Sequence, residues 1–322
     1  MTPKPCDVLC VGLIVADHVC APIERMPPAG TLITTERLEL TIGGCASNVA
    51  VDLAKLNVTV GISGRVGNDA LGRFVLEELQ HNHVCCDYVE LSSSSQTAAT
   101  QVVNVRGEDR RFIHSVGANA EITGLELPDE ALAQAKLLYV GGFGLNAALS
   151  GKNVASLFRR AHEHNVTTVL DVVIGDEDRI RELLPEALPE TDLFLPNTDE
   201  SQIITGLSDP WEQAAMFRRG GAKTVIVTCG KDGVVALDSS NRRFAAPSHQ
   251  VEQVDGTGGG DAFVSGFLYG MLHQAPLTDC IQYGAAMGAS CVKTAGATTG
   301  VFREQEMLDF VAANPLHIQC DA

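Results

Sequence analysis

The sequence predicts an α/β fold in which a mostly parallel central sheet is accompanied by a small, separate β-sheet. Two observations support this prediction. Short apolar runs alternate with amphipathic helical patterns along the chain, as in a parallel sheet covered by helices. Two further segments alternate like strands and interrupt that rhythm, and a parallel sheet has no place for hairpins there. With 322 residues, the chain is long for an average domain but suits a single large α/β domain.

Six apolar runs are candidate strands of the large sheet because they are short and lie between turn residues and helical patterns. They are Val8–Ile14, Val60–Val66, Leu137–Val140, Thr168–Val173, Leu193–Leu195 and Thr224–Thr228. Helical patterns cover Ala70–Leu79, for which Asp69 is a suitable cap, and Val154–His164. The last third of the chain predicts three further helices, near Asp261–His273, Asp279–Thr294 and Arg303–Ala313.

The small sheet is predicted from two segments. Thr31–Ile42 alternates like a strand. Thr97–Arg106 and Arg111–Ser115 form a hairpin pattern that turns at residues 107–109. A small sheet with two open faces is marginally stable by itself, so we expect its faces or edges to be covered.

Composition limits the function classes. A net charge of −17 and an isoelectric point near 4.8 argue against a nucleic-acid or membrane-surface partner. The ten cysteines include no Cys-x-x-Cys pair, which argues against a zinc ribbon. The sequence shows neither a secretory signal pattern nor an apolar run of about eighteen residues. We therefore expect a cytoplasmic protein with reduced thiols.

The most informative segment is a glycine-rich loop at residues 255–261 that leads directly into a helical pattern. The start of a helix presents free N–H groups and the positive end of the helix dipole, which together attract an anion. Asp261 would repel that anion, unless it accepts a proton from a hydroxyl while the amides hold a phosphoryl group. The alternative is a plain turn in which Asp261 only favours the helix dipole.

Two more helix starts carry polar side chains. Gly43 and Gly44 precede a helical pattern with Asn48 in its first turn, where its amide can bind a polyhydroxylated ligand or simply cap the helix. After the run that ends at Leu195, Asn197 and Glu200 are three residues apart. Their oxygens suit a hydrated Mg²⁺. The alternative for this pair is an ordinary helix start with an early acidic residue.

Together, these three motifs resemble those of the ribokinase-like (PfkB-type) carbohydrate kinases in their order and approximate spacing. The resemblance covers nearly the whole chain and implies one three-layer α/β/α domain spanning residues 1–322. The small sheet would then be a lid, with strands inserted at about residues 16–42 and 97–116. Because two lids commonly pair in this family, the resemblance also implies a homodimer.

The resemblance further implies an ATP-dependent kinase that phosphorylates a sugar hydroxyl, with Asp261 as the base. The amides of Gly258, Gly259 and Gly260 would form the anion hole. Asn197 and Glu200 would act around Mg²⁺ and the phosphates, with Asn197 on the ATP side and Glu200 reaching the metal through water.

The same resemblance suggests where the other ligands bind. Gly43, Gly44, Asn48, Asn119 and Asp17 are the expected acceptor-binding residues, since Asp17 follows the first predicted strand. The loop containing Thr228, Gly230 and Gly233 matches the nucleotide side. Asp255 and the carbonyl of Thr257 resemble a monovalent-cation site that would take K⁺. For Asn119 and Asp255, a turn residue and a loop cap are the respective alternatives.

The chain departs from the family pattern at several positions, including the run Gly141–Gly144, where ribokinases commonly have an acidic residue on the mid-chain strand. Asn57 stands where Gly or Ser is usual, and Gly256 stands where Thr or another small residue is usual. Cys45 occupies the place where ribokinases commonly have Lys, which weakens the case for a sugar-phosphate acceptor. A free sugar is therefore the first expectation for the acceptor, and a nucleoside is the second.

Two other functions remain as alternatives. Gly142, Gly144 and Ala147 form a Gly-x-Gly-x-x-Ala pattern after a strand, with Asp171 farther along, as in a dinucleotide-dependent oxidoreductase. The spacing is slightly too long, and this reading leaves the Asp255–Asp261 loop unexplained. A catalytically silent sugar-binding regulator on the same fold is the third reading, and the presence of Asp261 and Glu200 argues against it.

Overall fold

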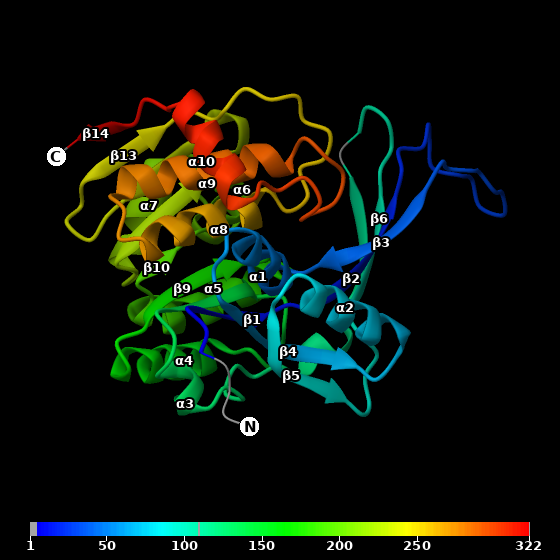
Figure 1. The fold of residues 1–322 in the computed structure, drawn as a ribbon, viewed down its shortest axis with the longest axis horizontal. Helices are drawn as coiled ribbons and strands as arrows, with labels where there is room; N and C mark the ends of the chain where they lie inside the picture. Colours follow the sequence, from blue (N-terminus) through cyan, green and yellow to red (C-terminus); the bar gives the residue numbers. More distant parts are fainter. Residues whose placement is uncertain (1–4, 109, 322) are drawn as a thin grey trace.

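A computed structural model describes residues 5–108 and 110–321. The described residues form a large ten-stranded sheet and a separate four-stranded sheet (Figure 1). Across the large sheet the strands are, in order, β14 (Gln319–Asp321), β13 (Arg243–Ala246), β12 (Val234–Leu237), β11 (Thr224–Thr228), β10 (Leu193–Phe194), β9 (Thr167–Val172), β8 (Leu137–Phe143), β1 (Val8–Gly12), β4 (Val60–Gly67) and β5 (Cys85–Ser92).

The large sheet is parallel from β5 to β11, as the sequence predicts. The strands β12, β13 and β14 pair antiparallel and extend the sheet beyond β11. These three strands and β5 are absent from the sequence prediction. The three antiparallel strands are only three or four residues long, so they contain too few residues for an alternating pattern to be recognised.

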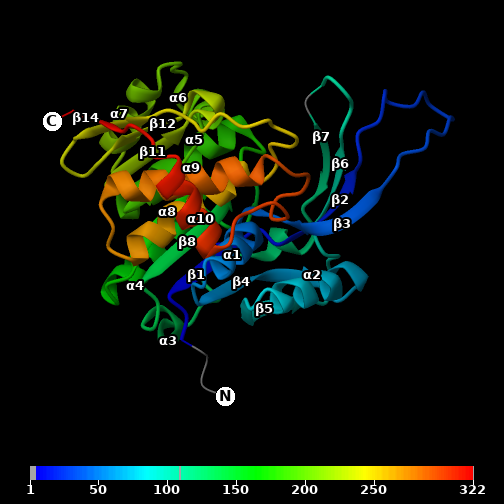
Figure 2. The ribbon, with the colours of Figure 1, turned by 45° about the horizontal axis from the view of Figure 1, so that its top comes forward.

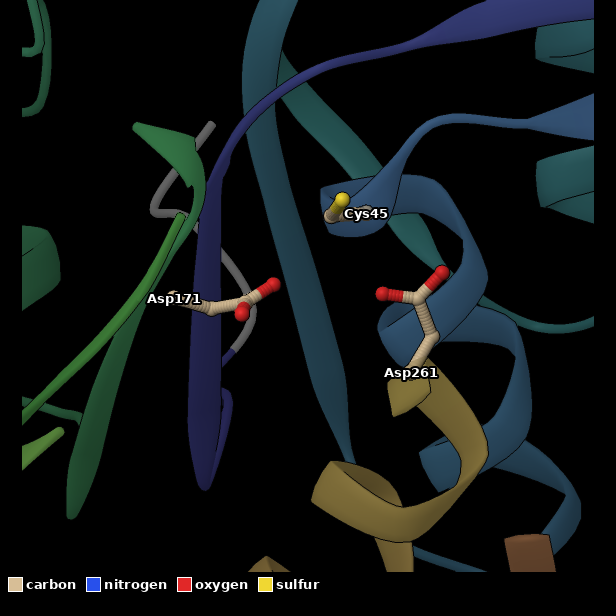
Figure 3. A group of neighbouring side chains, drawn as sticks. All are labelled: Cys45, Asp171 and Asp261. Carbon is tan, nitrogen blue, oxygen red and sulfur yellow. The ribbon is translucent and has the colours of Figure 1, made fainter. Parts of the chain in front are cut away.

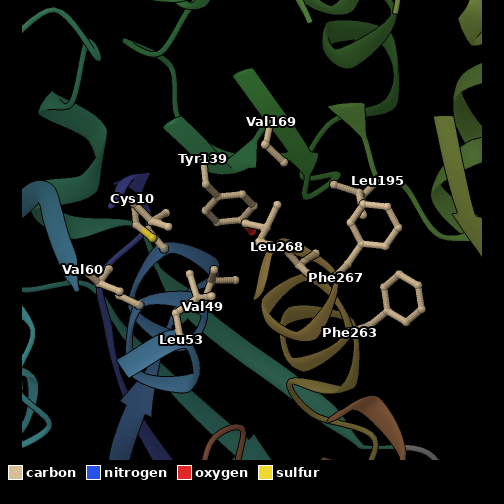
Figure 4. Close-up of a cluster of buried hydrophobic side chains, with 14 of the residues drawn as sticks. Cys10, Val49, Leu53, Val60, Tyr139, Val169, Leu195, Phe263, Phe267 and Leu268 are labelled. Carbon is tan, nitrogen blue, oxygen red and sulfur yellow. The ribbon is translucent and has the colours of Figure 1, made fainter. Parts of the chain in front are cut away.

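Helices cover both faces of the large sheet. On one face lie α1 (Cys45–Lys55), α2 (Ala70–His81), α8 (Gly259–Leu272) and α9 (Leu277–Cys291), with α10 (Glu304–Ala313) packed outside them. On the other lie α3 (Asp129–Leu132), α4 (Gly151–Glu163), α5 (Glu177–Ala187), α6 (Thr198–Thr205) and α7 (Pro210–Arg219). In the core, α1 and α8 meet beside Tyr139 of β8 (Figure 4).

The four-stranded sheet has the order β3 (Leu38–Gly43), β2 (Val15–Cys20), β6 (Ala99–Val103) and β7 (Arg111–Ser115). It projects from the body beside α1 and α2 (Figures 1 and 2). We call it the lid sheet. Its separation from the parallel sheet confirms the sequence prediction.

Several predicted boundaries of the strands are wrong, two of them near the start of the lid sheet. The strand predicted over Thr31–Ile42 begins only at Leu38. The first strand, predicted to reach Ile14, ends at Gly12, and the chain enters the lid sheet as β2. Gly12 has a φ of 137°, and a Cβ atom there would lie 2.1 Å from the carbonyl oxygen of Gly141. This close approach ends β1 at a glycine, which an apolar pattern does not reveal.

The described residues contain no helix both long and apolar enough to span a lipid bilayer.

Candidate active site

The start of α8 is an open helix N-terminus. Gly258 precedes it in the left-handed region, with a φ of 78°, and a Cβ atom there would lie 2.5 Å from the carbonyl oxygen of Ala297. Only glycine fits that position without strain. By contrast, a Cβ atom on Gly260 would meet nothing within 4 Å. The Gly259 amide donates a hydrogen bond of 3.3 Å to the Gly256 carbonyl. The first amides of a helix otherwise lack intrahelical acceptors, so this helix start can bind an anion.

Asp261 lies in that first turn and carries a carboxylate with a pKa near neutrality. Burial raises the pKa of Asp261 to about 6, and the carboxylate of Asp17 adds to the shift. The amide of Asn48 donates a hydrogen bond of 2.8 Å to the Asp261 carboxylate, which works in the opposite direction. A carboxylate of this kind is ionised at neutral pH and is still basic enough to accept a proton.

Asp17 lies close to Asp261, beside the glycines that precede α1. Asp17 lies on β2 of the lid sheet, rather than at the end of a strand of the large sheet as the sequence suggested. A Cβ atom on Gly43 would lie 1.9 Å from a carboxylate oxygen of Asp17, so glycine makes room for this side chain. Burial raises the pKa of Asp17 to about 6.

Two buried oxygens at this end of the site have no hydrogen-bond partner among the described residues. They are Oδ1 of Asp17 and Oδ1 of Asn48, both of which belong to side chains that are at least nine-tenths buried. Buried polar atoms without partners are costly. Both atoms accept hydrogen bonds, so a ligand that supplies hydroxyl donors would satisfy them.

Asp171 and Cys45 complete this part of the site (Figure 3). The Cys45 sulfur and carboxylate oxygens of Asp171 and Asp261 all lie within 4.8 Å of one another. Tyr139 donates a 2.9 Å hydrogen bond to Asp171. Burial, with Glu200 and Asp261 nearby, raises the pKa of Asp171 well above its usual range. In the sequence, Asp171 was noted only for the dinucleotide alternative. Its place at the carboxyl end of a parallel strand was the available signal.

Asn197 and Glu200 form a capping box at the start of α6. The Asn197 side chain accepts a hydrogen bond from the Glu200 amide at 2.8 Å, and the Glu200 carboxylate accepts one from the Asn197 amide at 2.9 Å. Burial raises the pKa of Glu200 to about 7, and Asp261 contributes to the shift. The pair therefore acts as a helix cap in this structure, and its action on Mg²⁺ stays a prediction.

Asp255 organises the loop before α8. One of its oxygens accepts hydrogen bonds from the amide and the hydroxyl of Thr257, at 2.9 and 2.7 Å, and the other accepts the Gly296 amide at 3.1 Å. The carbonyl of Thr257 accepts a hydrogen bond from the thiol of Cys291. The loop-capping alternative is thus present in the structure, and the monovalent-cation site stays a prediction.

Asn119 is completely buried, and its amide bonds with a backbone segment rather than with the site. It accepts a hydrogen bond from the Ile14 amide at 3.3 Å and donates one to the Ile14 carbonyl at 3.0 Å. Ile14 lies between β1 and β2, where neither strand satisfies its backbone. Asn119 therefore supports the crossover into the lid sheet, and direct binding of an acceptor by its amide stays untested.

The residues expected on the nucleotide side lie at the end of β11. The Thr228 amide donates to the Pro196 carbonyl at 3.1 Å, which joins this strand end to the start of α6. Gly230 and Gly233 both have positive φ, and a Cβ atom on Gly233 would lie 2.0 Å from the carbonyl oxygen of Ala246. These glycines form a tight turn, and their contact with ATP stays a prediction.

The dinucleotide alternative fails on local structure. Gly142 lies within β8, and Gly144 follows that strand. The next helix, α4, begins only at Gly151, so no helix N-terminus faces the two glycines. A pyrophosphate site of this type requires a helix that starts at the glycine turn.

Comparisons with known proteins agree with this arrangement. The family model of the pfkB family carbohydrate kinases matches residues 6–303. A ribokinase of Haemophilus influenzae is 25% identical over 308 residues, which cover 94% of this chain and 97% of the relative. An aminoimidazole riboside kinase of Salmonella typhimurium is 28% identical over 288 residues, with coverages of 85% and 89%. The solved structure of Arabidopsis thaliana ribokinase with ribose and ATP has a TM-score of 0.81 at 22% identity, covers 96% of this chain and 99% of its own, and confirms the fold.

Proposed function

The chain belongs to the pfkB family of carbohydrate kinases, and we propose that it transfers the γ-phosphoryl group of ATP to a hydroxyl of an uncharged sugar, with Asp261 as the base. The observation that supports this proposal is the position of Asp261. It is a carboxylate with a raised pKa in the first turn of an open helix N-terminus, beside two unpartnered acceptors, Asp17 and Asn48.

The proton moves from the acceptor hydroxyl to a carboxylate oxygen of Asp261. Asn48 holds that carboxylate by donating to it, which fixes its orientation toward the acceptor. The amides of Gly258, Gly259 and Gly260 belong to the helix start and carry partial positive charge toward the transferred phosphoryl group. Phosphoryl transfer depends mainly on such positioning and on charge stabilisation.

The donor atoms of α6 fit a hydrated Mg²⁺. One carboxylate oxygen of Glu200 bonds the Asn197 amide, which leaves the other to hold a metal-bound water. The raised pKa of Glu200, at about 7, shows a buried acid without a counter-charge, and a divalent cation would supply one. Bound Mg²⁺ would neutralise charge on the ATP phosphates. Thr228, Gly230 and Gly233 are the proposed ATP contacts at the end of β11.

The charges around the acceptor favour a neutral sugar. The carboxylates of Asp17 and Asp261, each with a pKa of about 6, are mostly ionised at neutral pH, and Cys45 stands where ribokinases commonly have Lys. An acceptor that carries a phosphate or carboxylate would be repelled by these groups, whereas hydroxyl donors would satisfy them. The Salmonella relative is named for a riboside, so a nucleoside is the second candidate for the acceptor.

The lid sheet supports the proposal of a homodimer. It exposes large apolar side chains on two of its strands: Leu38 of β3 is 68% exposed, and Phe112 and Ile113 of β7 are 51% and 69% exposed. Apolar residues gathered on a small sheet are typical of an interface. A second copy that covers the lid sheet would bury them.

Two expectations remain predictions. One is that a monovalent cation such as K⁺ binds at Asp255 and the carbonyl of Thr257. The other is the cytoplasmic location.

The test is an assay of ADP release with a panel of free sugars, nucleosides, sugar phosphates and sugar acids, with ATP and Mg²⁺ present. The proposal expects turnover with at least one free sugar and weak or no turnover with the anionic acceptors. ADP release that occurs only with nucleosides would favour the second candidate. Preference for a sugar phosphate would overturn the assignment of the acceptor class.

A further inference from the structure

Arg110 reaches from the lid sheet to the loop that precedes α8. It directly precedes β7, and its Nη1 atom lies 3.9 Å from a carboxylate oxygen of Asp255. Both side chains are largely buried, with 25% and 5% of their surface exposed. Figures 1 and 2 both show the β6–β7 hairpin standing beside the loop before α8. The lid sheet and the helix start that carries Asp261 are therefore in direct contact.

Gly256 makes this contact possible. A Cβ atom there would lie 2.7 Å from Nη1 of Arg110 and 2.9 Å from Nε2 of Gln253. Any larger residue at this position would displace the guanidinium group or the loop. Glycine replaces the usual Thr or other small residue of the family at this position, and the absence of a side chain leaves the space that Arg110 occupies.

The neighbouring arginine does not share this arrangement. Arg111 pairs with Glu108 within the hairpin and is half exposed. Arg110 instead stacks over the Phe112 ring, with its guanidinium carbon 5.5 Å from the ring centre, which holds the side chain toward the loop. Arg111 is therefore a matched control: it has the same charge on the same hairpin but is not directed at Asp255.

The oxygen of Asp255 nearest to Arg110 is the one that accepts the amide and the hydroxyl of Thr257. Thr257 directly precedes Gly258, the left-handed residue from which α8 starts. The guanidinium group and the two donors of Thr257 all face the same carboxylate oxygen, so the position of Arg110 influences how this oxygen accepts the two hydrogen bonds. The charge of Arg110 therefore acts on the geometry of the proposed anion hole.

We propose that Arg110 is a positioning residue that couples the lid sheet to the phosphoryl-transfer loop. With the lid closed over an acceptor, it supplies the positive charge at Asp255 that would otherwise have to come from a monovalent cation. The kinetic part of this inference rests on the proposed kinase function, whereas the contact itself does not. A kinase built in this way depends little on K⁺ as long as Arg110 is present.

The experiment compares Arg110→Gln with Arg111→Gln in the full-length protein. For Arg110→Gln we expect kcat to fall about tenfold to hundredfold, the loss associated with misplacing reacting groups by a change away from the chemistry. Replacing a large organic cation with K⁺ at fixed ionic strength should restore part of that activity, while wild type and Arg111→Gln respond weakly. Gly256→Thr should behave like Arg110→Gln, because it fills the same space.

A second measurement needs no activity. Amide hydrogen exchange in the segment 254–261 should be faster in Arg110→Gln than in wild type and unchanged in Arg111→Gln. Equal exchange in the two variants, or equal kinetics and K⁺ responses, would overturn the proposal. If wild type has no kinase activity but the exchange difference is present, the proposed function fails while the contact between the lid and the loop stands.

Discussion

The helices α1 and α8 both begin after a glycine with a positive φ, but their first turns differ in what surrounds them. At α1, the second helical residue, Ala46, is completely buried, and the Ser47 hydroxyl hydrogen-bonds to backbone carbonyls nearby. At α8, the second helical residue, Gly260, is exposed, and a Cβ atom there would meet nothing within 4 Å. The start of α1 is enclosed by protein, whereas the start of α8 is free to receive a ligand.

This difference matches what each helix start is proposed to bind. The enclosed start holds preformed hydrogen-bonding groups for a neutral acceptor, with Asn48 and Asp17 already in place. The open start offers amides to a phosphoryl group that is present only during turnover. The hydrogen bond between Asn48 and Asp261 joins the two at the reacting position.

The largest effect should come from removing the proposed base. Asp261→Asn should lower kcat by about 10²- to 10⁴-fold, the usual range for the loss of a general base. ATP binding, measured by calorimetry, should change only a few-fold, because the amides of the open helix start are retained. Turnover within tenfold of wild type would exclude Asp261 from this role.

Two glycines at the helix starts should respond differently to the same substitution. Gly44→Ala places a side chain at a φ of 91° and against a carbonyl, which should lower the free energy of unfolding by at least about 1–2 kcal/mol. Gly260→Ala meets no neighbouring atom and lies within a helix, so stability should stay the same or rise slightly. Urea unfolding of the two variants measures this difference. A loss of similar size in Gly260→Ala would contradict the open surroundings assigned to the first turn of α8.

A smaller effect, which depends on the Mg²⁺ concentration, is expected from a substitution at Glu200. Glu200→Gln keeps an oxygen for the capping box but removes the charge, so the Mg²⁺ concentration for half-maximal rate should rise several-fold. Activity at saturating Mg²⁺ should recover at least partly. An unchanged Mg²⁺ titration would leave Glu200 as a helix cap alone.

Ionisation of the buried Asp17 carboxylate should lower the stability of the protein as the pH rises. Asp17 has a pKa raised from 3.8 to about 6 in the folded protein, so folding favours its protonated form. Its stabilising contribution is complete below about pH 4 and is lost as the pH increases through about 6. At pH 8, Asp17→Asn should therefore be more stable than wild type, by up to about 3 kcal/mol for a shift of this size. Denaturant unfolding without ligands at pH 4 and pH 8 tests this, and an advantage of equal size at both values would be inconsistent with it.

The sequence was sufficient for most of the parallel strands, the separate lid sheet and the glycine-led helix starts. These features follow from local patterns, such as apolar runs, alternation and glycines before helical segments. The bend at Gly12 was missed because it depends on a contact between distant residues, Gly12 and Gly141, and the strands β12–β14 were missed because they are too short to show a pattern.

The side-chain partners within the site could not be predicted for the same reason. Asn48 was expected to bind the acceptor, yet it also holds Asp261, 213 residues away in the chain. Asn119 was expected in the acceptor site, and its amide bonds the backbone of Ile14 instead. Arg110 and Gly256 are 146 residues apart and meet only through the folding of the lid sheet onto the body.

The pH dependence of kcat/KM for the acceptor tests the central claim, that Asp261 accepts the proton at the junction of the two helix starts. The measurement uses saturating ATP and Mg²⁺. Since the pKa of Asp261 is raised to about 6, kcat/KM should be level above about pH 7 and fall about tenfold per pH unit well below 6. The residual rate of Asp261→Asn should lack this fall. A wild-type kcat/KM that is constant from pH 5 to pH 8 would contradict the assignment of Asp261 as the base.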